Sequence, residues 1–360
     1  MSFPWPRTDL TELIGIEHPI IQAPMAGVAS PALAAAVSNA GGLGSLGCGE
    51  MTVEQLRESF GETRAWTARP FNINFFAHEA PEHPSDDAAA MRGWLAGYYQ
   101  ELDVRESPSL SETPMRSFDA ATLRAVLELE PQIVSFHFGL PAHDMLDALK
   151  STGTVILSSA TTVSEARRLE AAGVHAIIAQ GYDAGGHRGT FSEPIAAGSI
   201  GTFALVPQIV DAVSVPVIAA GGIADGRGIA AAFALGASGV QMGTAFILCP
   251  ESAASPVYRE VLRQTRDDET VVTRAFTGRP ARAIVNRFVE EMAPREDDVA
   301  PFPLQDSLTL ALHVASVARG SKDLAAMLAG QASPLARALP AAALVETLVC
   351  EAQEALAREK

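Results

Sequence analysis

The sequence predicts an α/β fold, a parallel (β/α)8 barrel with a small additional lobe over its C-terminal mouth. Two observations predict the barrel: eight short apolar runs recur along the chain, and Ala- and Leu-rich segments of helical length separate them. Strands that are apolar on both faces and alternate with helices are typical of a parallel sheet covered by helices. Eight strands close such a TIM barrel. Two regions that break this rhythm predict the additional lobe.

The predicted strands are rich in Val, Ile and Phe and are bounded by turn residues. They span residues 19–25, 42–47, 71–76, 133–138, 154–159, 176–181, 215–222 and 239–244. The helices between them carry capping signals. Ser30 is placed to cap a helix that has Pro31 in its first turn and Gly41 at its C-terminal end. Residues 161–173 and 225–237 repeat this pattern.

The regions that break the rhythm suggest a division of the chain. Residues 77–115 contain several prolines and many acidic residues, which predicts an excursion over one mouth of the barrel. We therefore expect a barrel over residues 1–250 with an insertion at about 77–115. A small substrate-side lobe would follow over 251–306, and C-terminal helices over 307–360 would pack back on the barrel.

Composition excludes several classes of function. The formal charge of −16 argues against a nucleic-acid surface and against membrane-surface binding, because both need a basic face. The first residues do not have the pattern of a signal peptide, so a cytoplasmic location is expected. Three scattered cysteines form no CxxC pair and indicate neither a disulfide framework nor a metal site.

Two glycine motifs match the letters of the dinucleotide-binding fingerprint, but their contexts do not fit it. GLGSLG at Gly42–Gly47 follows a helix and overlaps a strand, whereas the fingerprint needs a strand that leads into a helix. GRGIAA at Gly226–Ala231 is followed by no acidic residue until Glu251. An open dinucleotide-binding sheet is therefore disfavoured.

A third glycine pattern suggests a phosphate site. AAGGIADG follows the seventh predicted strand and QMGTAF lies at the eighth, where barrels of this kind present backbone N–H groups to a phosphate. Glycine allows close approach of the backbone, and a threonine hydroxyl adds a donor. The residues placed to form this cradle are Gly221, Gly222, Gly243 and Thr244. The alternative is that the glycines only make tight turns.

Two histidines follow barrel strands and are candidates for chemistry. His187 lies in the glycine-rich turn AQGYDAGGHRGTF after the sixth strand, on the face where such barrels keep catalytic groups, and we predict a catalytic role. His137 lies near the end of the fourth strand and is expected to contact substrate, unless it is a buried hydrogen-bonded histidine. Arg188 could attract an anionic substrate or be solvated.

Several motifs together resemble one family. The stretches Gln22–Gly47, Ala179–Gly189, Pro216–Phe246 and Thr273–Asn286 are similar to the FMN-dependent nitronate monooxygenases, formerly called 2-nitropropane dioxygenases. FNINFFAH and VSFHFGLP point to the branch of that family that includes the fungal enzymes. The resemblance covers most of the chain and is weakest over residues 80–115 and after Val314.

The resemblance implies a cofactor and roles for individual residues. The backbone of Ala23, Pro24 and Met25 would lie against the flavin ring of FMN, while the ring and ribityl chain would be bound by other residues. Matching positions for cofactor binding are Ala23, Met25, Asn72, Gln180, Gly185, Gly222, Gln241, Met242, Gly243 and Thr244. His187 matches the family's catalytic histidine.

The implied reaction converts a nitronate and O2 into a carbonyl compound and nitrite, and propionate 3-nitronate is one candidate substrate. A neutral nitroalkane must first lose its α-proton, and imidazole titrates close enough to neutrality to accept it. A nitronate is already deprotonated, so His187 would then mainly position the anion. The expected partners are a small-molecule nitronate or nitroalkane and O2, and the protein would be a monomer or a homodimer.

Two alternatives remain open at this point. One is an FMN-dependent enoyl-ACP reductase that uses NAD(P)H, since such enzymes resemble this sequence in the barrel and in the GGH turn. The other is a barrel that binds a phosphorylated metabolite without flavin. That alternative leaves Asn72 and Gln180 without an evident role, and no lysine stands at a strand end in these motifs to form a Schiff base.

Overall fold

The structure is a computed structural model, and it describes residues 7–79, 86–104, 115–192 and 194–357. The predicted TIM barrel is confirmed, with all eight predicted strands in one parallel sheet. In chain order the strands are β1 (Ile20–Gln22), β2 (Gly44–Gly47), β3 (Phe71–Phe76), β4 (Ile133–His137), β5 (Val155–Ala160), β6 (Ala176–Gln180), β8 (Val217–Ala220) and β9 (Gly239–Met242).

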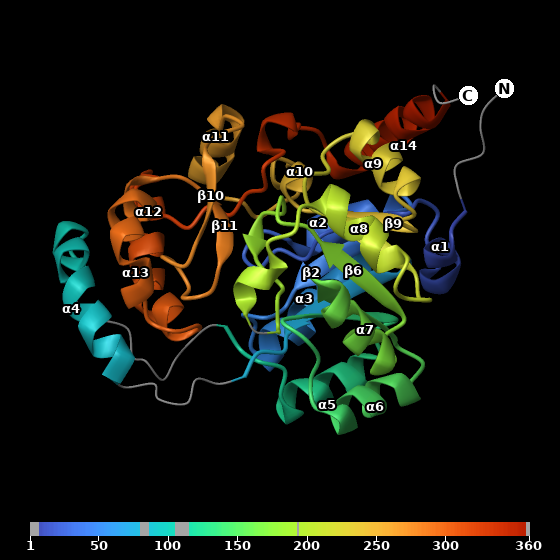
Figure 1. Cartoon of the computed structure of the whole chain (residues 1–360), viewed down its shortest axis with the longest axis horizontal. Coiled ribbons are helices and arrows are strands. Elements are labelled where there is room, and N and C mark those ends of the chain that lie inside the picture. The colour runs from blue at the N-terminus through green and yellow to red at the C-terminus, as the bar shows by residue number, and fades with distance from the viewer. Residues whose placement is uncertain (1–6, 80–85, 105–114, 193, 358–360) are drawn as a thin grey trace.

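The sheet closes on itself. Its strand order is β1-β9-β8-β6-β5-β4-β3-β2, and a parallel bridge between Ile21 and Leu43 joins the two ends of this order. Closure leaves no free sheet edge. Helices surround the strands (Figure 1). They are α1 (Asp9–Ile14), α2 (Pro31–Asn39), α3 (Val53–Trp66), α5 (Ala120–Leu129), α6 (His143–Ser151), α7 (Val163–Ala171), α8 (Thr202–Val210) and α9 (Gly226–Ala234).

Most barrel helices begin at capping residues that the sequence contains, although α6 and α8 have no side-chain cap. The Ser30 hydroxyl accepts a hydrogen bond from the N–H of Leu33 at 3.0 Å, and Pro31 is the first residue of α2. Thr162 and Asp225 cap α7 and α9 in the same way. These side chains satisfy backbone donors that a helix leaves free at its N-terminus. The local sequence thus sets where the helices start.

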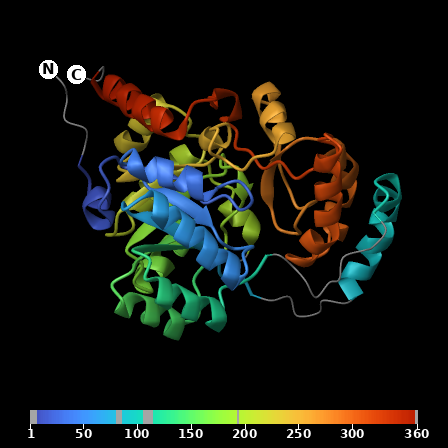
Figure 2. The ribbon, with the colours of Figure 1, turned by 180° about the vertical axis from the view of Figure 1, so that it is seen from behind.

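The two fingerprint-like glycine motifs serve close packing. A Cβ on Gly44 would overlap the backbone of Ala34 in α2, and a Cβ on Gly226 would overlap the backbone of Glu351 and Ala352. The second contact belongs to α14 (Ala341–Ala357), which packs along α9 and α2 (Figures 1 and 2). Glycine is required at both positions because two backbones approach each other there.

The barrel interior contains a column of polar side chains beneath its C-terminal mouth. Gln22 accepts from the N–H of Ser45 at 2.8 Å through its Oε1. The amide nitrogens of Asn72 and Asn74 each lie 2.9 Å from the hydroxyl of Ser135. All of these side chains are buried. Buried polar groups need hydrogen-bond partners, so this network fixes the orientation of the side chains on β3.

A second core lies beside the barrel mouth. It forms around α4 (Asp86–Glu101), α12 (Arg287–Met292) and α13 (Leu304–Ala318), with Leu95, Phe288 and Leu308 among its buried residues. A three-stranded antiparallel sheet adjoins it, made of β10 (Thr270–Thr273), β11 (Ala281–Ile284) and the short β7 (Gly186–His187). Further elements are α10 (Thr244–Ile247), α11 (Pro256–Gln264), η1 (Ile195–Gly198), η2 (Ala293–Asp298) and η3 (Ser333–Leu335).

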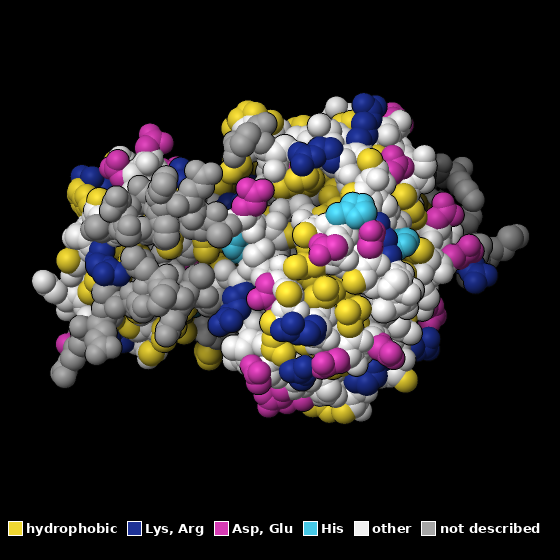
Figure 3. Space-filling view, turned by 90° about the horizontal axis from the view of Figure 1, so that it is seen from below, with side chains coloured by type: hydrophobic (Ala, Val, Ile, Leu, Met, Phe, Trp, Pro, Cys, Tyr) yellow, Lys and Arg dark blue, Asp and Glu magenta, His cyan; other side chains and the backbone are white. Residues whose placement is uncertain are grey.

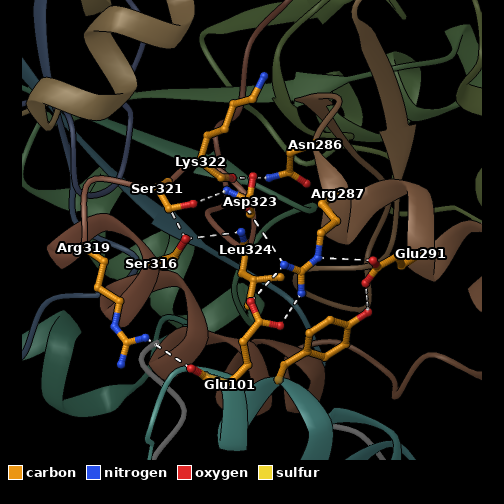
Figure 4. Close-up of polar contacts among 11 residues, drawn as sticks. Glu101, Asn286, Arg287, Glu291, Ser316, Arg319, Ser321, Lys322, Asp323 and Leu324 are labelled. Atoms are coloured by element: carbon orange, nitrogen blue, oxygen red, sulfur yellow. Dashed lines mark hydrogen bonds and ion pairs between the residues drawn. The ribbon is translucent and has the colours of Figure 1, made fainter.

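The insertion helix α4 is joined to this lobe by polar contacts (Figure 4). The Arg287 guanidinium donates to both carboxylate oxygens of Glu101 and forms an ion pair with Glu291 at 3.2 Å. The hydroxyl of Tyr98 donates to Glu291 at 2.6 Å, and Arg319 donates to the carbonyl oxygen of Leu102 at 2.6 Å. Helix α4 therefore belongs structurally with α12 and α13, far along the chain.

The C-terminal helices pack on different partners. Helix α13 shares its core with α4, whereas α14 packs on the barrel helices α9 and α2. The division into a barrel, a lobe over 251–306 and C-terminal helices over 307–360 stays a proposal. In the described part of the chain, no helix has both the length and the hydrophobicity that a membrane span requires.

Candidate active site

A cavity of about 420 Å³ lies at the carboxyl ends of the barrel strands. Its walls come from the loops that follow the strands and from the lobe, including β7 and α13. The predicted site residues that line it are Ala23, Met25, His137, Gln180, Gly185, His187, Gly222, Gln241, Met242, Gly243 and Thr244. The fold thus gathers these positions, from five separate parts of the chain, around one space.

Asn72 is the predicted site residue that does not line this cavity. Its neighbour on the same strand face, Asn74, does line it. Side chains two residues apart on a strand point to the same side, one further along the strand. Asn72 therefore lies one layer deeper in the barrel, bonded to Ser45 and Ser135, while Asn74 reaches the cavity.

The glycine loops after β8 and β9, which are the predicted cradle, both line the cavity. Gly221 and Gly222 have φ angles of 109° and 69°, a left-handed conformation that favours glycine. Gly243 leads into Thr244, the first residue of α10, whose hydroxyl accepts from the N–H of Gly330 at 3.0 Å. The hydroxyl proton of Thr244 is then free to donate. Backbone N–H groups and this hydroxyl are donors suited to an anion.

The two glutamines differ in how their side chains are bonded. Gln180 donates to the carbonyl oxygen of His187 at 2.9 Å and accepts from the N–H of Gly189 at 2.7 Å, so it fixes the His187 loop. Gln241 has a buried Oε1 without a hydrogen-bond partner among the described residues. An unpaired buried amide oxygen beside a cavity is costly unless a ligand donates to it.

His187 is held by the small sheet. As part of β7 it pairs with Ala281, and its Nε2 lies 2.9 Å from the hydroxyl of Thr277. When that hydroxyl donates to the carbonyl oxygen of Arg279, 3.3 Å away, it accepts from Nε2–H, and in this tautomer Nδ1 carries no proton. Burial, together with the positive charges of His137, Arg279 and His78, lowers the pKa of His187 to about 3. The ring is therefore neutral at physiological pH.

His137 supports the His187 loop from below. Its Nδ1 lies 2.9 Å from the Ser159 hydroxyl, and its Nε2 lies 3.1 Å from the carbonyl oxygen of His187. Since a carbonyl only accepts, Nε2 carries the ring proton and Nδ1 accepts from Ser159. Burial lowers the pKa of His137 to about 4. Both ring nitrogens are engaged in positioning, although the ring also lines the cavity.

Aromatic rings surround His187. The ring centroids of Phe138 and Phe302 each lie 5.8 Å from that of His187, and Phe76 lies at 6.4 Å. Phe138 has a φ of 71°, which bulky residues rarely adopt and which is often found at functional sites. The Arg279 guanidinium lies 4.0 Å from the Phe138 ring centroid, behind this aromatic wall.

Sequence reasoning left Thr277, Phe302 and Arg279 without roles. Thr277 and Arg279 lie in the motif TRAFTGRPARAIVN, so the resemblance of this motif to the family could have indicated that they belong to the site. Arg188, left open, is a buried clamp: its guanidinium donates to the carbonyl oxygens of Gln180, Gly181 and Gly198 at 2.6–3.0 Å. It therefore fixes the loop after β6 and is neither solvated nor directed at the cavity.

Comparisons with known proteins agree with this geometry. The family model described as nitronate monooxygenase matches residues 7–351. A nitronate monooxygenase from Pseudomonas aeruginosa is 48% identical over 347 residues, which cover 95% of this chain and 98% of that protein.

Two solved structures extend this comparison. That of a nitroalkane oxidase from Streptomyces ansochromogenes superposes with a TM-score of 0.90 at 41% identity, covering 98% of this chain and 99% of that chain. That of FabK from Thermotoga maritima superposes with a TM-score of 0.77 at 33% identity, covering 98% of each chain. The extent and identity of these matches show that the chain belongs to the nitronate monooxygenase family.

Proposed function

We propose that this protein is an FMN-dependent enzyme that oxidises alkyl nitronates with O2 to a carbonyl compound and nitrite. Neutral nitroalkanes would be accepted after His187 removes their α-proton. One observation carries the proposal: the neutral imidazole of His187 lines the same cavity as the glycine loops after β8 and β9. A proton acceptor beside an anion cradle is the arrangement that this reaction needs, and family membership supports it.

The cavity residues fit FMN. Gly222, Gly243 and Thr244 offer backbone and hydroxyl donors for the phosphate, and the unpaired Oε1 of Gln241 can accept from the cofactor. The segment Ala23–Met25 would lie against the ring. Bound there, the flavin would take electrons from the nitronate and pass them to O2.

The cofactor contact expected of Asn72 is better assigned to its neighbour. Asn74 reaches the cavity, whereas Asn72 lies below it. We therefore propose Asn74 for this role. The amide nitrogen of Asn74 already donates to Ser135, which leaves its oxygen to accept from the flavin. Gln180 and Gly185 would act from the opposite loop.

His187 would move the substrate proton through Nδ1. Thr277 accepts from Nε2–H and so keeps Nδ1 unprotonated, and His137 fixes the loop through the His187 carbonyl. A pKa of about 3 makes the ring a weak base when no substrate is bound. The negative charge that forms on the substrate as the proton leaves stabilises the imidazolium, and so raises this pKa when it is needed.

The proposal also covers the branch of the family, the location of the protein and its assembly. FNINFFAH and VSFHFGLP favour the branch of the family that includes the fungal enzymes. A cytoplasmic location stays a proposal. The assembly is proposed to be a monomer or a homodimer.

The absorbance spectrum of the purified protein tests the cofactor. We expect flavin bands, or their appearance after incubation with FMN. A colourless protein that takes up no FMN would contradict the proposal and favour a flavin-free barrel. Anaerobic mixing then tests the reaction: a nitronate should bleach the flavin. Bleaching by NADH but not by a nitronate would favour the enoyl-ACP reductase alternative.

A further inference from the structure

Asp306 is a buried carboxyl group that lines the cavity from the first turn of α13. It is only 8% exposed, and its Oδ2 has no hydrogen-bond partner among the described residues. Its neighbours on the helix do not complete it, since the Oε1 of Gln305 and the Oγ of Ser307 are unpaired as well and neither residue lines the cavity. A buried carboxyl oxygen without a partner is costly, and it indicates a ligand that completes the hydrogen bonding.

Asp306 lies at the same end of the cavity as His187. The ring centroid of Phe302, which precedes Asp306 by four residues, is 5.8 Å from that of His187. Glu50, in the loop after β2, also lines the cavity and is close enough for its charge to act on Asp306. The loop that carries Glu50 packs on the ring of Phe76, whose centroid is 6.4 Å from that of His187. The carboxyl of Asp306 therefore adjoins the space in which a substrate would meet His187.

No positive side chain lines this space. Among the described residues that form the cavity wall there is no lysine or arginine. Arg279 lies behind Phe138 and donates to the carbonyl oxygen of Thr190. Burial is the main cause that lowers the pKa of His187 to about 3 and that of His137 to about 4, so both rings are neutral at physiological pH. Within the described part of the cavity, the charge of a nitronate is therefore met by neutral donors.

The exterior shown in Figure 3 offers no basic patch that would attract an anion instead. On this face of the barrel, acidic and basic side chains are interspersed. Interspersed surface charges are screened and exert little attraction at a distance. The binding of a nitronate therefore depends on donors inside the cavity.

The other polar side chains at this end of the cavity are already engaged. His137 donates its ring proton to the carbonyl oxygen of His187, and Thr309 donates to that of Phe276. The amide nitrogen of Asn74 donates within the polar network of the barrel. These protons are therefore committed to the protein rather than to a ligand.

His313 presents a further donor, but at a distance from Asp306. Its Nδ1 accepts the N–H of Ala326 at 3.0 Å, so the proton of the neutral ring is on Nε2. It follows Asp306 by seven residues, which is about 10 Å along a helix. The carboxyl of Asp306, when it carries a proton, is thus the donor that α13 offers beside His187.

We propose that Asp306 binds the nitronate as a protonated carboxyl that donates a hydrogen bond to the anionic group. The proposal rests on the proposed function and adds a binding residue to it. Without this proton, the carboxylate would face the nitronate as a like charge in a desolvated site and would repel it. The proton on Asp306 thus determines whether the cavity accepts or rejects its substrate.

The surroundings of Asp306 favour its protonated form. Burial, and then the charge of Glu50, raise the pKa of Asp306 to about 7, and burial also raises the pKa of Glu50. Arg279 exerts its positive charge on the histidines from behind the aromatic wall. The pKa values of the histidines around this cavity are all lowered by burial, and these residues are His78, His137, His187 and His313.

The test measures kcat/KM for preformed ethylnitronate on the FMN-loaded enzyme between pH 6 and 9. We expect the value to be constant below about pH 7 and to fall about tenfold per pH unit above it, because the ionised form of Asp306 does not bind the anion. Asp306→Asn keeps a donor of similar shape that does not titrate, so its profile should be flat. Asp306→Leu should also be flat, but lower than wild type at pH 6 by about tenfold or more, since a hydrogen bond to a charged group is lost.

A second variant tests the influence of Glu50 on Asp306. Glu50→Gln removes the charge that raises the pKa of Asp306, so the fall in kcat/KM should begin at a lower pH than in wild type. Glu54→Gln is the matched control, because Glu54 is exposed on α3 outside the cavity and the variant loses the same charge. Its profile should coincide with that of wild type. Flavin spectra and melting temperatures show whether each variant folds.

A wild-type profile that does not fall between pH 7 and 9 would overturn the proposal, as would a fall of wild-type size in Asp306→Asn. A second measurement is independent of turnover, because the carboxylate of propionate is planar and anionic like a nitronate. The Kd of propionate, followed by the flavin absorbance, should rise with pH above about 7 in wild type and stay constant in Asp306→Asn. If no nitronate is oxidised, the proposed function fails, while the propionate titration still decides whether a protonated Asp306 binds an anion.

Discussion

The barrel and the lobe are built in different ways. Most barrel helices start at a side-chain cap from their own segment, α6 and α8 being the exceptions. The strands pair in chain order around the barrel, whose apolar core holds Ile73, Phe136 and Val240. The lobe collects α4, α12, α13 and the two residues of β7 from distant parts of the chain. Local sequence therefore determines the barrel, and long-range contacts determine the lobe. The barrel supplies the glycine loops that we propose as an anion cradle, and His187 and Asp306 line the same cavity from the side of the lobe.

The largest expected effect is at the clamp that ties β7 to the barrel. Arg188→Met removes the guanidinium donor from three carbonyl oxygens, those of Gln180, Gly181 and Gly198. Of these, the Gly181 oxygen still accepts from the N–H of Ala184. We expect the free energy of unfolding to fall by about 3 kcal/mol or more, since unsatisfied buried acceptors cost about 1–3 kcal/mol each. Urea denaturation measures this. Arg227→Met is the control, because the Arg227 side chain is 76% exposed. A similar loss of unfolding free energy in this control would contradict the stabilising role of Arg188.

A smaller effect is expected where the β6 loop meets the segment after α13. A Cβ on Gly185 would lie 2.5 Å from the backbone nitrogen of Gly330, too close for any real contact. Gly185→Ala should therefore lower stability by about 1–3 kcal/mol, as overpacking does, and weaken FMN retention. Gly61→Ala is the matched control, because a Cβ on Gly61 meets nothing within 4 Å. Equal melting temperatures for the two variants would contradict the close packing of Gly185 against Gly330.

The pH dependence of stability tests the junction between barrel and lobe. His78, His137 and His187 all have pKa values lowered by burial, to between about 3 and 4. The unfolded chain, with histidine pKa values near 6.5, then binds more protons below that pH. The stability contributed by these three rings should be fully present above pH 6.5 and should decline on going to pH 5. The raised pKa of Asp306, about 7, contributes in the opposite direction over this range, and we expect a net decline of about 1 kcal/mol or more. An unfolding free energy that stays constant between pH 7 and 5 would contradict these buried neutral rings.

The smallest effect is expected within the lobe. Arg287 pairs with Glu101 and Glu291 at partly exposed positions between α4 and α12. Arg287→Ala should cost about 0.2–1 kcal/mol, because exposed ion pairs contribute little and are screened by salt. The difference from wild type should shrink in 1 M NaCl. A loss of several kcal/mol would mean that α4 depends on these pairs more than on its apolar core.

The contrast between the regions also explains what the sequence predicted. Apolar runs and capping residues are local signals, so the eight strands and the cap at Ser30 were predicted correctly. Strand β7 was not predicted, because Gly186 and His187 form a strand only by pairing with residues near 281. The residues next to Gly186 and His187 in the chain do not indicate this pairing.

The site shows the same limit. Strand alternation places Asn72 and Asn74 on one face, but only the depth of the cavity distinguishes them. Asp306 lies in a helix that gave no motif, and its importance arises from its burial opposite the barrel mouth. The role of a residue that depends on its position in the folded protein therefore could not be predicted from the local sequence pattern.

The measurement that tests the account most directly compares His187→Asn with wild type on nitroethane and on ethylnitronate, each at matched FMN content. If His187 removes the α-proton, kcat/KM for nitroethane should fall by about 10²–10⁴-fold, the usual contribution of a positioned base. The value for ethylnitronate, which has no such proton to lose, should change by less than about tenfold. Equal losses on both substrates would contradict the role of His187 as the base.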